Sequence, residues 1–261
     1  MTDFTGKVAL ITGAGSGIGR AAAQLYAGRG GTVIAFDLKG VEETAAGHDR
    51  ITAMTGDAGD KGDVDRAVAA AVAAAEQIGG GLDFAFANAG VGGGLSPLLD
   101  LTVAEWESVL RVNLIGVFLT VQAAARVMVA AGHGSIVATA SVAGIRSGAG
   151  GVPYSASKAG VINLVATAAN QLSGSGVRVN AVCPGLTETG MTQAWFDGAR
   201  ARGTEHKLGQ LNPLKRAAGP AEIAEVALFL ASDAASYVNG QAIAVDGGLS
   251  SSHPTVPGRM A

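Results

Sequence analysis

The alternation of short apolar runs with longer alanine-rich segments is the feature that most constrains the fold of this chain. The runs that are predicted to be strands are 7–12, 32–37, 51–57, 82–88, 134–141, 177–184 and 242–248. Most of them are continuously apolar, which is typical of strands covered on both faces. Helical patterns lie between them at about 17–29, 63–78, 103–131, 154–172 and 221–231. This order predicts right-handed βαβ units, and so a Rossmann-type doubly wound α/β sheet of about seven mostly parallel strands with helices on both faces.

The length of the chain and the lack of an internal linker or repeat favour one domain. A chain of 261 residues can form one large core, and no Pro/Ser-rich linker or internal repeat divides it. We expect a catalytic domain over 1–248 and a C-terminal tail over 249–261, where no periodic pattern remains. The stretch 186–219 is the longest without a predicted strand, and so long an irregular connection is typical of a substrate lid.

Composition and charge exclude several classes of protein. Hydrophobic residues make up 48% and charged residues 15% of the chain, which favours a packed globule over disorder. The net charge of −3 gives no basic surface for nucleic acid or an anionic membrane. No signal peptide is visible, and the apolar stretches fall short of the roughly 18 residues that span a bilayer. With one cysteine, Cys183, and no histidines at metal-ligand spacing, we expect a soluble cytoplasmic protein without a metal site.

A strand, a glycine turn and a helix follow one another directly in "VALITGAGSGIGRAAAQLY". Gly13, Gly17 and Gly19 give the spacing T-G-x-x-x-G-x-G. Glycines let the backbone approach a pyrophosphate, and the free N–H groups at the start of the helix point at the anion. A plain strand–helix turn is the simpler alternative, but four glycines within seven residues are an unfavourable way to make one.

The second predicted strand ends in Asp37, 18 residues beyond Gly19. A carboxylate at this place accepts both ribose hydroxyls of an adenosine and repels a 2′-phosphate. Ser16 and Leu38 are uncharged, although Lys39 lies close by. The pattern therefore favours NAD over NADP.

The stretch "VPYSASKAG" at 152–160 places Tyr154 four residues before Lys158. Residues four apart on a helix lie on one face, and Pro153 suits the first turn. Taken alone, this spacing favours an ordinary amphipathic helix with a half-buried tyrosine and a solvated lysine. The alternative is a phenol held beside a fixed cation.

Several motifs together resemble those of the short-chain dehydrogenase/reductase family, over nearly the whole chain. "TGAGSGIG" at 12–19 is similar to its cofactor motif, and "NAG" at 88–90 to the motif after its fourth strand. Asn113, Ser141 and "YSASK" at 154–158 match its catalytic set in order and spacing. "PGLTET" at 184–189 resembles the segment that holds the nicotinamide, and "AVDGG" the last strand.

The resemblance implies a dehydrogenase or ketone reductase that moves a hydride between NAD(H) and a secondary alcohol or ketone. It makes Tyr154 the general acid/base, with Lys158 holding the nicotinamide ribose and lowering the phenol pKa. Ser141 would bind the substrate oxygen, and Asn113 would order a water. The cofactor-binding residues that the motifs imply are Gly13, Ser16, Gly17, Ile18, Gly19, Asp37, Leu38, Asp57, Ala58, Asn88, Ala89, Gly90, Tyr154, Lys158, Pro184, Gly185, Thr187 and Thr189.

The expected lowering of the phenol pKa is energetically feasible. A shift from about 10 to about 7.5 requires roughly 3.4 kcal/mol of differential stabilisation. One cation at about 4 Å, in an effective dielectric near 20, supplies on the order of 4 kcal/mol. Lys158 is therefore expected to account for most of the shift, with the positive nicotinamide of NAD⁺ adding to it.

The predicted substrate wall is mostly apolar. It consists of Ser141, Val142, Val152, Tyr154, Leu186, Met191 and Trp195, with Phe196 beside them. No arginine is obviously placed to anchor a carboxylate, so an apolar alcohol or ketone is expected. Alternatively, Trp195 and Phe196 only pack a lid helix.

Two other functions stay open. A 3-oxoacyl-thioester reductase acting on a carrier protein usually needs NADPH and a basic docking patch, and Asp37 and the acidic net charge count against it. A non-catalytic dinucleotide-binding protein on the same fold would not need the intact catalytic set.

The resemblance also implies a homotetramer that packs the helices near 103–131 and 154–172 against their copies. We expect the tail at 249–261 to reach a neighbouring subunit.

Overall fold

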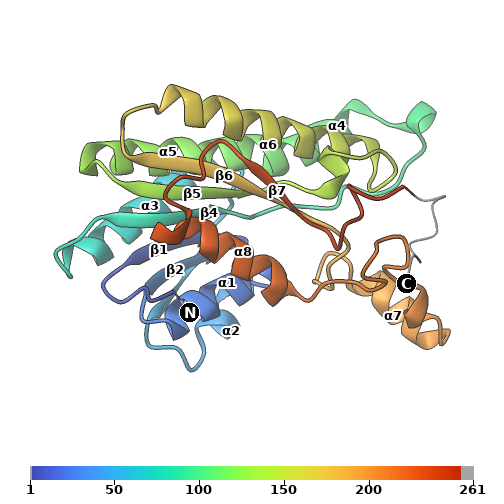
Figure 1. Cartoon of the computed structure of the whole chain (residues 1–261), viewed down its shortest axis with the longest axis horizontal. Coiled ribbons are helices and arrows are strands. Elements are labelled where there is room, and N and C mark those ends of the chain that lie inside the picture. Colours follow the sequence, from blue (N-terminus) through green and yellow to red (C-terminus); the bar gives the residue numbers. More distant parts are fainter. Residues whose placement is uncertain (1, 254–261) are drawn as a thin grey trace.

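The strands form one parallel sheet (Figure 1). The computed structural model describes residues 2–253, and within them the strand order is β3-β2-β1-β4-β5-β6-β7. The strands are β1 Val8–Thr12, β2 Thr32–Asp37, β3 Ile51–Thr55, β4 Leu82–Ala87, β5 Gly134–Thr139, β6 Val177–Pro184 and β7 Ala242–Val245. Every neighbouring pair is parallel. The predicted Rossmann-type fold is confirmed.

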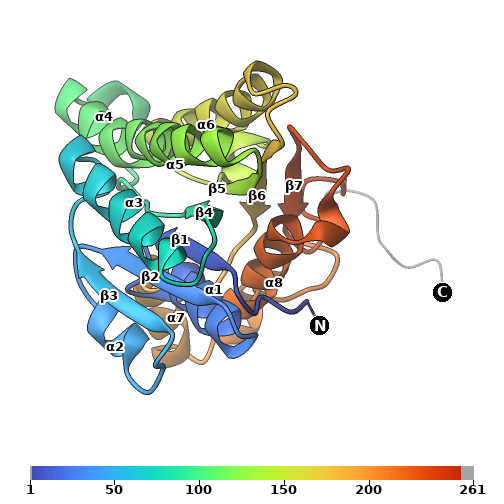
Figure 2. The same ribbon diagram turned by 90° about the vertical axis from the view of Figure 1, so that its left-hand side faces the viewer.

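Helices cover both faces of the sheet (Figure 2). They are α1 Gly17–Gly28, α2 Val41–Ala45, α3 Lys61–Glu76, α4 Val103–Leu110, α5 Val117–Ala131, α6 Val152–Gln171, α7 Gln193–Ala201 and α8 Pro220–Ala231. The buried residues of α3, α5 and α6 form one core cluster, and those of α1 and α8 form the other. Strand β1 serves both clusters, because Val8 and Leu10 face the first and Ala9 and Ile11 face the second.

The strand order reverses between β1 and β4. The chain runs outward from β1 to β2 and β3, and then returns to the other side of β1 to build β4 to β7. The crevice outside the carboxyl ends of the strands at such a switch point is the usual ligand site of a doubly wound sheet. Gly13 follows β1 and Asn88 follows β4, so both motifs lie at this point.

The helix predicted over 103–131 has an interruption that the sequence did not predict. A π-helical turn, Arg111–Gly116, joins α4 to α5. The whole run Val103–Ala131 is long and apolar enough, by length and composition, to cross a membrane, which corrects the expectation that no stretch reaches that length. Its most apolar window is 44% buried in the fold, however, and residues such as Val117, Val121 and Met128 belong to the core cluster. A core helix of an α/β domain has these properties.

The stretch 186–219 is less irregular than predicted. It contains α7 and a 3-10 turn, Glu205–Lys207. Its two ends are joined, because the Ala218 N–H donates to the Leu186 carbonyl and the Glu188 N–H donates to the Ala218 carbonyl. The segment therefore leaves the end of β6 and returns to it, with its two ends held together by backbone hydrogen bonds. Of the predicted tail, 254–261 lies outside the described residues.

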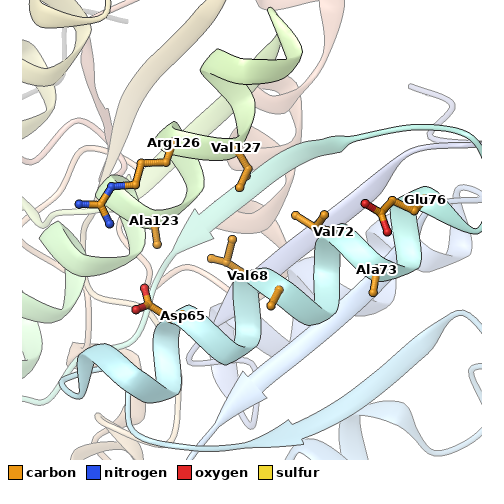
Figure 3. A pocket seen from close by; sticks show the side chains of 9 residues that line it. Asp65, Val68, Val72, Ala73, Glu76, Ala123, Arg126 and Val127 are labelled. Atoms are coloured by element: carbon orange, nitrogen blue, oxygen red, sulfur yellow. The ribbon is translucent and has the colours of Figure 1, made fainter.

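A shallow groove runs between α3 and α5 on the outside of the helical layer (Figure 3). Its floor is apolar, with Val68 and Val72 from α3 and Val127 from α5. Asp65 and Arg126 lie at its rim. None of the predicted site residues lines it.

Candidate active site

The β1–α1 turn is built for close backbone approach. A Cβ at Gly13, where φ is +65°, would lie 2.7 Å from the Cα of Ala89, and a Cβ at Gly19 would lie 2.1 Å from the Gly13 carbonyl oxygen. Helix α1 then begins at Gly17, with Ser16 as an N-cap whose side chain makes no capping hydrogen bond and with no acidic residue in the first turn. The first N–H groups of α1 therefore lack a side-chain acceptor, which suits an external anion.

Asp37 reaches this turn from the end of β2. Its carboxylate accepts the Gly15 N–H at 2.9 Å and the Leu38 N–H at 2.7 Å. Within residues 2–253, no cationic nitrogen lies within 4.0 Å of it. The carboxylate therefore has backbone N–H groups as its partners. Leu38 is exposed, and Ile18 packs against the core.

Arg20 is a structural residue of this region that the sequence analysis missed. Its guanidinium donates to the carbonyls of Gly15 and Gly40, and it forms an ion pair with Glu43 at 3.4 Å. Arg20 therefore ties the glycine turn to the start of α2. Position 20 carries no motif that would have distinguished it from a solvated helix residue.

Asp57 is bonded within the protein. Its carboxylate accepts from Arg111 at 2.8 Å and from the Gly59 N–H at 2.7 Å. Burial opposes ionisation, but these hydrogen bonds outweigh it and lower the pKa of the carboxyl. Ala58 is buried, and a Cβ on Gly116 would lie 2.7 Å from its carbonyl oxygen. The expected adenine contacts of Asp57 and Ala58 stay a prediction.

Asn88 acts as a brace between strands. Its Nδ2 donates to the carbonyls of Thr12 and Gly13, both at 3.2 Å, and its Oδ1 accepts from Thr139 Oγ1 at 2.9 Å. Thr12 Oγ1 in turn accepts the N–H groups of Asn88 and Ala89. The NAG motif thus holds the ends of β1, β4 and β5 together, and Thr12 and Thr139 are partners that the sequence analysis missed.

Lys158 lies at the centre of the site. Its ammonium is 2% exposed and donates to the Thr139 carbonyl at 2.7 Å. A Cβ on Gly90 would lie 3.5 Å from this nitrogen, so Gly90 leaves the approach to Lys158 open. One protein acceptor leaves two ammonium donors for other groups, such as ribose hydroxyls.

Tyr154 and Ser141 are neighbours in the site. Tyr154 lies in the first turn of α6, next to Pro153, and its phenol is close enough to Ser141 for that side chain to lower the phenol pKa. Ser141 Oγ is held from behind by the Ala143 N–H at 3.1 Å. The Lys158 nitrogen lies 5.7 Å from the centroid of the Tyr154 ring. The structure therefore brings Ser141, Tyr154 and Lys158 together.

The pKa values in the protein alone differ from the expected ones. Burial raises the pKa of Tyr154, and the hydrogen bond from Ser141 offsets this only in part. Burial also lowers the pKa of Lys158 to about 8. In the protein alone, Lys158 therefore does not lower the phenol pKa below its usual value, and the sequence estimate left out the desolvation of both groups.

Asn113 occupies the π-helical turn and is fully buried. Its Oδ1 accepts the Val91 N–H at 2.7 Å, and its Nδ2 donates to the Val91 carbonyl at 2.9 Å. The same Nδ2 lies 3.3 Å from the hydroxyl of Ser157, which donates to the Tyr154 carbonyl at 2.6 Å. Asn113 thus joins the loop after β4 to the catalytic helix, as π-turns at functional sites often do.

The segment after β6 closes over the glycine turn. A Cβ on Gly17 would lie 2.9 Å from Cβ of Thr189, and one on Gly190 would lie 3.4 Å from the Ser16 hydroxyl. The Thr187 hydroxyl donates to the Gly185 carbonyl at 3.1 Å. Thr189 and Gly190 therefore lie beside the start of α1, and the nicotinamide contacts expected of 184–189 stay a prediction.

The predicted substrate residues divide into two groups. Val152, Met191 and Trp195 are about half exposed, and Met191 lies against Gly92 in the loop after β4. Val142 and Phe196 are buried, so Phe196 packs the lid helix as the alternative held. Leu186 lines a different cavity, near Leu214 and Val245, which includes neither Ser141 nor Tyr154.

Another apolar side chain borders the site. Leu95 is exposed, and its Cδ2 would lie 3.9 Å from a Cβ on Gly151, shortly before Tyr154. The loop after β4 carried no strand or helix pattern that would have indicated this approach. Within residues 2–253, no group of three or more His, Cys, Asp or Glu side chains could hold a metal ion.

The uncapped start of α1 lies at the switch point of the sheet, and Tyr154, Ser141 and the buried Lys158 lie together. This combination is typical of a dinucleotide-dependent oxidoreductase. A family model described as enoyl-(acyl carrier protein) reductase matches residues 13–250. Cis-4-hydroxycyclohexanecarboxylate dehydrogenase of Sinomonas cyclohexanicum is 42% identical over 251 residues, 94% of this chain and 97% of that protein. The 3-oxoacyl-(acyl-carrier-protein) reductase of Thermotoga maritima is 41% identical over 250 residues, 94% of this chain and 98% of that protein.

The crystal structure of levodione reductase matches the fold with a TM-score of 0.88 and 36% identity, over 96% of this chain and 100% of that one. The chain belongs to the short-chain dehydrogenase/reductase family. It is an alcohol dehydrogenase or ketone reductase that uses a nicotinamide dinucleotide.

Proposed function

We propose that this chain is an NAD-preferring dehydrogenase of apolar, ring-shaped secondary alcohols, with Tyr154 as the general acid/base. The observation that carries the proposal is the grouping of the Tyr154 phenol with Ser141 and with the buried Lys158, whose ammonium lies 5.7 Å from the centre of the Tyr154 ring. Half-exposed apolar side chains lie on the neighbouring segments.

The residues present fit the cofactor. The uncapped start of α1 offers N–H groups to a pyrophosphate, and Asp37 offers a carboxylate to the adenosine ribose. Lys158 keeps two donors for the nicotinamide ribose. The unneutralised charge of Asp37 supports NAD over NADP.

The side chains divide the chemistry between them. When bound, the oxidised nicotinamide supplies the hydride acceptor and a positive charge near Tyr154. In alcohol oxidation, the Tyr154 phenolate takes the hydroxyl proton while Ser141 holds the same oxygen, and the carbinol carbon gives up its hydride. In ketone reduction, Tyr154 returns a proton to that oxygen. Lys158 stabilises the phenolate by its charge, and Asn113 fixes the catalytic helix to the loop after β4.

The substrate class rests on the site and on one relative. The name of the Sinomonas enzyme specifies a hydroxycyclohexanecarboxylate, and the half-exposed apolar side chains of Val152, Met191 and Trp195 offer contacts to the ring of such a substrate. The Thermotoga relative supports the alternative of a 3-oxoacyl-thioester reductase. Asp37 counts against that role as long as it requires NADPH.

The assembly and location are further parts of the proposal. Ile115, Phe118 and Val129 expose apolar surface along α4–α5, and Ala156 and Ala159 expose small side chains on α6. Such faces permit close packing of helices against their copies in a homotetramer. The one cysteine is buried and free, which suits the cytoplasm. We keep 1–248 as one catalytic domain with 186–219 as its lid.

The test is a cofactor and substrate panel on the wild-type protein. Cyclohexanol, cis-4-hydroxycyclohexanecarboxylate and an open-chain secondary alcohol are each supplied with NAD⁺ or NADP⁺, and an acetoacetyl thioester with NADH or NADPH. Faster turnover of ring alcohols with NAD⁺ supports the proposal. Turnover of the thioester with NADPH, and none of the alcohols, contradicts it.

A further inference from the structure

We propose that the turn at residues 246–250 is a positioning unit that fastens three segments around the reaction centre, with Arg146 as its link to the substrate loop. The "substrate loop" here is 142–152, between Ser141 and α6. The inference rests on the proposed function for its kinetic readout.

Asp246 builds the turn. Its carboxylate, which is 7% exposed, accepts the Gly248 N–H at 2.9 Å and the Ser250 N–H at 2.7 Å. Burial opposes ionisation, but the hydrogen bonds from residues 248–250 outweigh it and lower the pKa of the carboxyl. The turn is therefore held in one shape by a charged acceptor at its centre.

The first segment held by the turn is the one at the nicotinamide. The Gly185 N–H donates to the Val245 carbonyl at 3.0 Å. A Cβ on Gly185 would lie 2.8 Å from Cα of Asp246, so the two backbones are in direct contact. The segment 184–189 thus contacts the turn at Gly185 and the start of α1 at Thr189.

The second segment is the end of the lid. The Leu214 N–H donates to the Gly247 carbonyl at 3.3 Å. A Cβ on Gly247 would lie 2.9 Å from the Asn212 side chain, and one on Gly248 would lie 3.0 Å from Cγ of Pro213. Both glycines have positive φ, +64° and +86°, so the turn needs glycine for its backbone as well as for these contacts.

The third segment is the substrate loop. The Arg146 guanidinium donates to the carbonyl of Leu249, and the Arg146 N–H donates to the Val142 carbonyl at 2.8 Å. No carboxylate within residues 2–253 lies within ion-pair distance of Arg146. Its charge is therefore directed at a backbone carbonyl of the turn, which gives a charge-assisted hydrogen bond.

The substrate loop touches the Tyr154 ring and the backbone of Lys158, both on α6. A Cβ on Gly150 would lie 2.8 Å from Cδ1 of Tyr154, and one on Gly144 would lie 2.7 Å from the Lys158 backbone. A shift of this loop therefore changes the space in front of the phenol. Because the Arg146 guanidinium links the loop to residues 246–250 through the Leu249 carbonyl, losing it frees the loop from the lid and from the nicotinamide segment.

The test compares Arg146→Gln, Arg146→Lys, Asp246→Asn and the double variant Arg146→Gln/Asp246→Asn. We expect Arg146→Gln to raise KM for the alcohol about tenfold with a smaller change in kcat, because a misplacement of about 1 Å can cost about 100-fold and the loop keeps its other contacts. The Kd for NAD⁺ and the Tm should stay close to those of the wild type. Arg146→Lys should recover part of the loss, and the double variant should lose no more than the worse single variant, since the two residues act through one unit.

Two results would overturn the inference. One is an unchanged KM in Arg146→Gln. The other is that the kinetic losses of the single variants add in the double variant, or that they follow the loss of Tm and Arg146→Lys is no better than Arg146→Gln. Backbone hydrogen exchange distinguishes a failure of this inference from a failure of the proposed function. If the wild type oxidises no alcohol, faster exchange in both 142–152 and 246–250 of Arg146→Gln still supports the link, and unchanged exchange in the loop refutes it.

Discussion

Replacing Lys158 by methionine should stabilise the protein while abolishing its activity. The ammonium is 2% exposed, and burial lowers its pKa from 10.5 to about 8. At about 1.4 kcal/mol per pKa unit, the protonated side chain costs the folded state about 3 kcal/mol. Methionine has a similar length and no charge, but it leaves the Thr139 carbonyl without its donor, a loss of about 1–2 kcal/mol. The net expectation is a gain of about 1–2 kcal/mol in the free energy of unfolding near neutral pH.

The pH dependence makes this prediction specific. Between about pH 8 and the unfolded value of 10.5, the unfolded chain holds the Lys158 proton and the folded protein does not. Wild-type stability therefore rises with pH through this window, relative to the variant. The advantage of Lys158→Met should be fully present below about pH 8 and should shrink by about 3 kcal/mol by about pH 10.5.

The assay is urea unfolding of both proteins at about pH 7 and about pH 10, at one protein concentration. Lys158→Arg serves as a charged control, which should not be stabilised at the lower pH. A stability difference between wild type and Lys158→Met that is the same at both pH values would refute the reasoning. The reasoning would also be refuted if Lys158→Met were less stable than the wild type at about pH 7 but not at about pH 10.

Three further predictions follow from single positions. Asp37→Ala should lower the preference for NAD⁺ over NADP⁺ about tenfold in kcat/KM, and an unchanged ratio would mean that the carboxylate does not set it. Gly13→Ala, with φ at +65° and a Cβ 2.7 Å from Ala89, should cost about 2 kcal/mol or more by chemical denaturation, while Gly28→Ala, with nothing within 4 Å, should be neutral or stabilising. Cys183 is buried, and burial raises its thiol pKa to about 11, so a thiol reagent should label it only after denaturation; labelling of the native protein would contradict its burial.

The sheet was predictable because its strands are continuously apolar and separated by helical patterns. The glycine turn and Asp37 were predictable because their chemistry follows directly from position along a βαβ unit. Helix α7 was expected only as the alternative lid helix, because it lies in a stretch of mixed composition and its buried face, with Phe196 and Ala199, is defined by tertiary contacts.

Other features of the site depend on contacts between distant residues. The π-turn at Arg111–Gly116 holds Asn113, which bonds to Val91, 22 residues earlier, and no local pattern reports that pairing. The bracing roles of Arg20 and Thr139 likewise appear only once the strand ends meet. The Tyr154 pKa is raised in the protein alone, against the expectation, because burial, which sequence does not give, outweighs the effect of Ser141.

The most direct test of the central claim is a comparison of wild type with Tyr154→Phe. The measurement is reduction of NAD⁺ by the best alcohol of the panel, together with the Kd for NAD⁺ of each protein. The account predicts that the variant binds NAD⁺ as the wild type does and loses turnover by about 100-fold or more, because only the proton-transfer group is removed. An unchanged kcat in Tyr154→Phe would contradict the assignment of Tyr154 as the general acid/base.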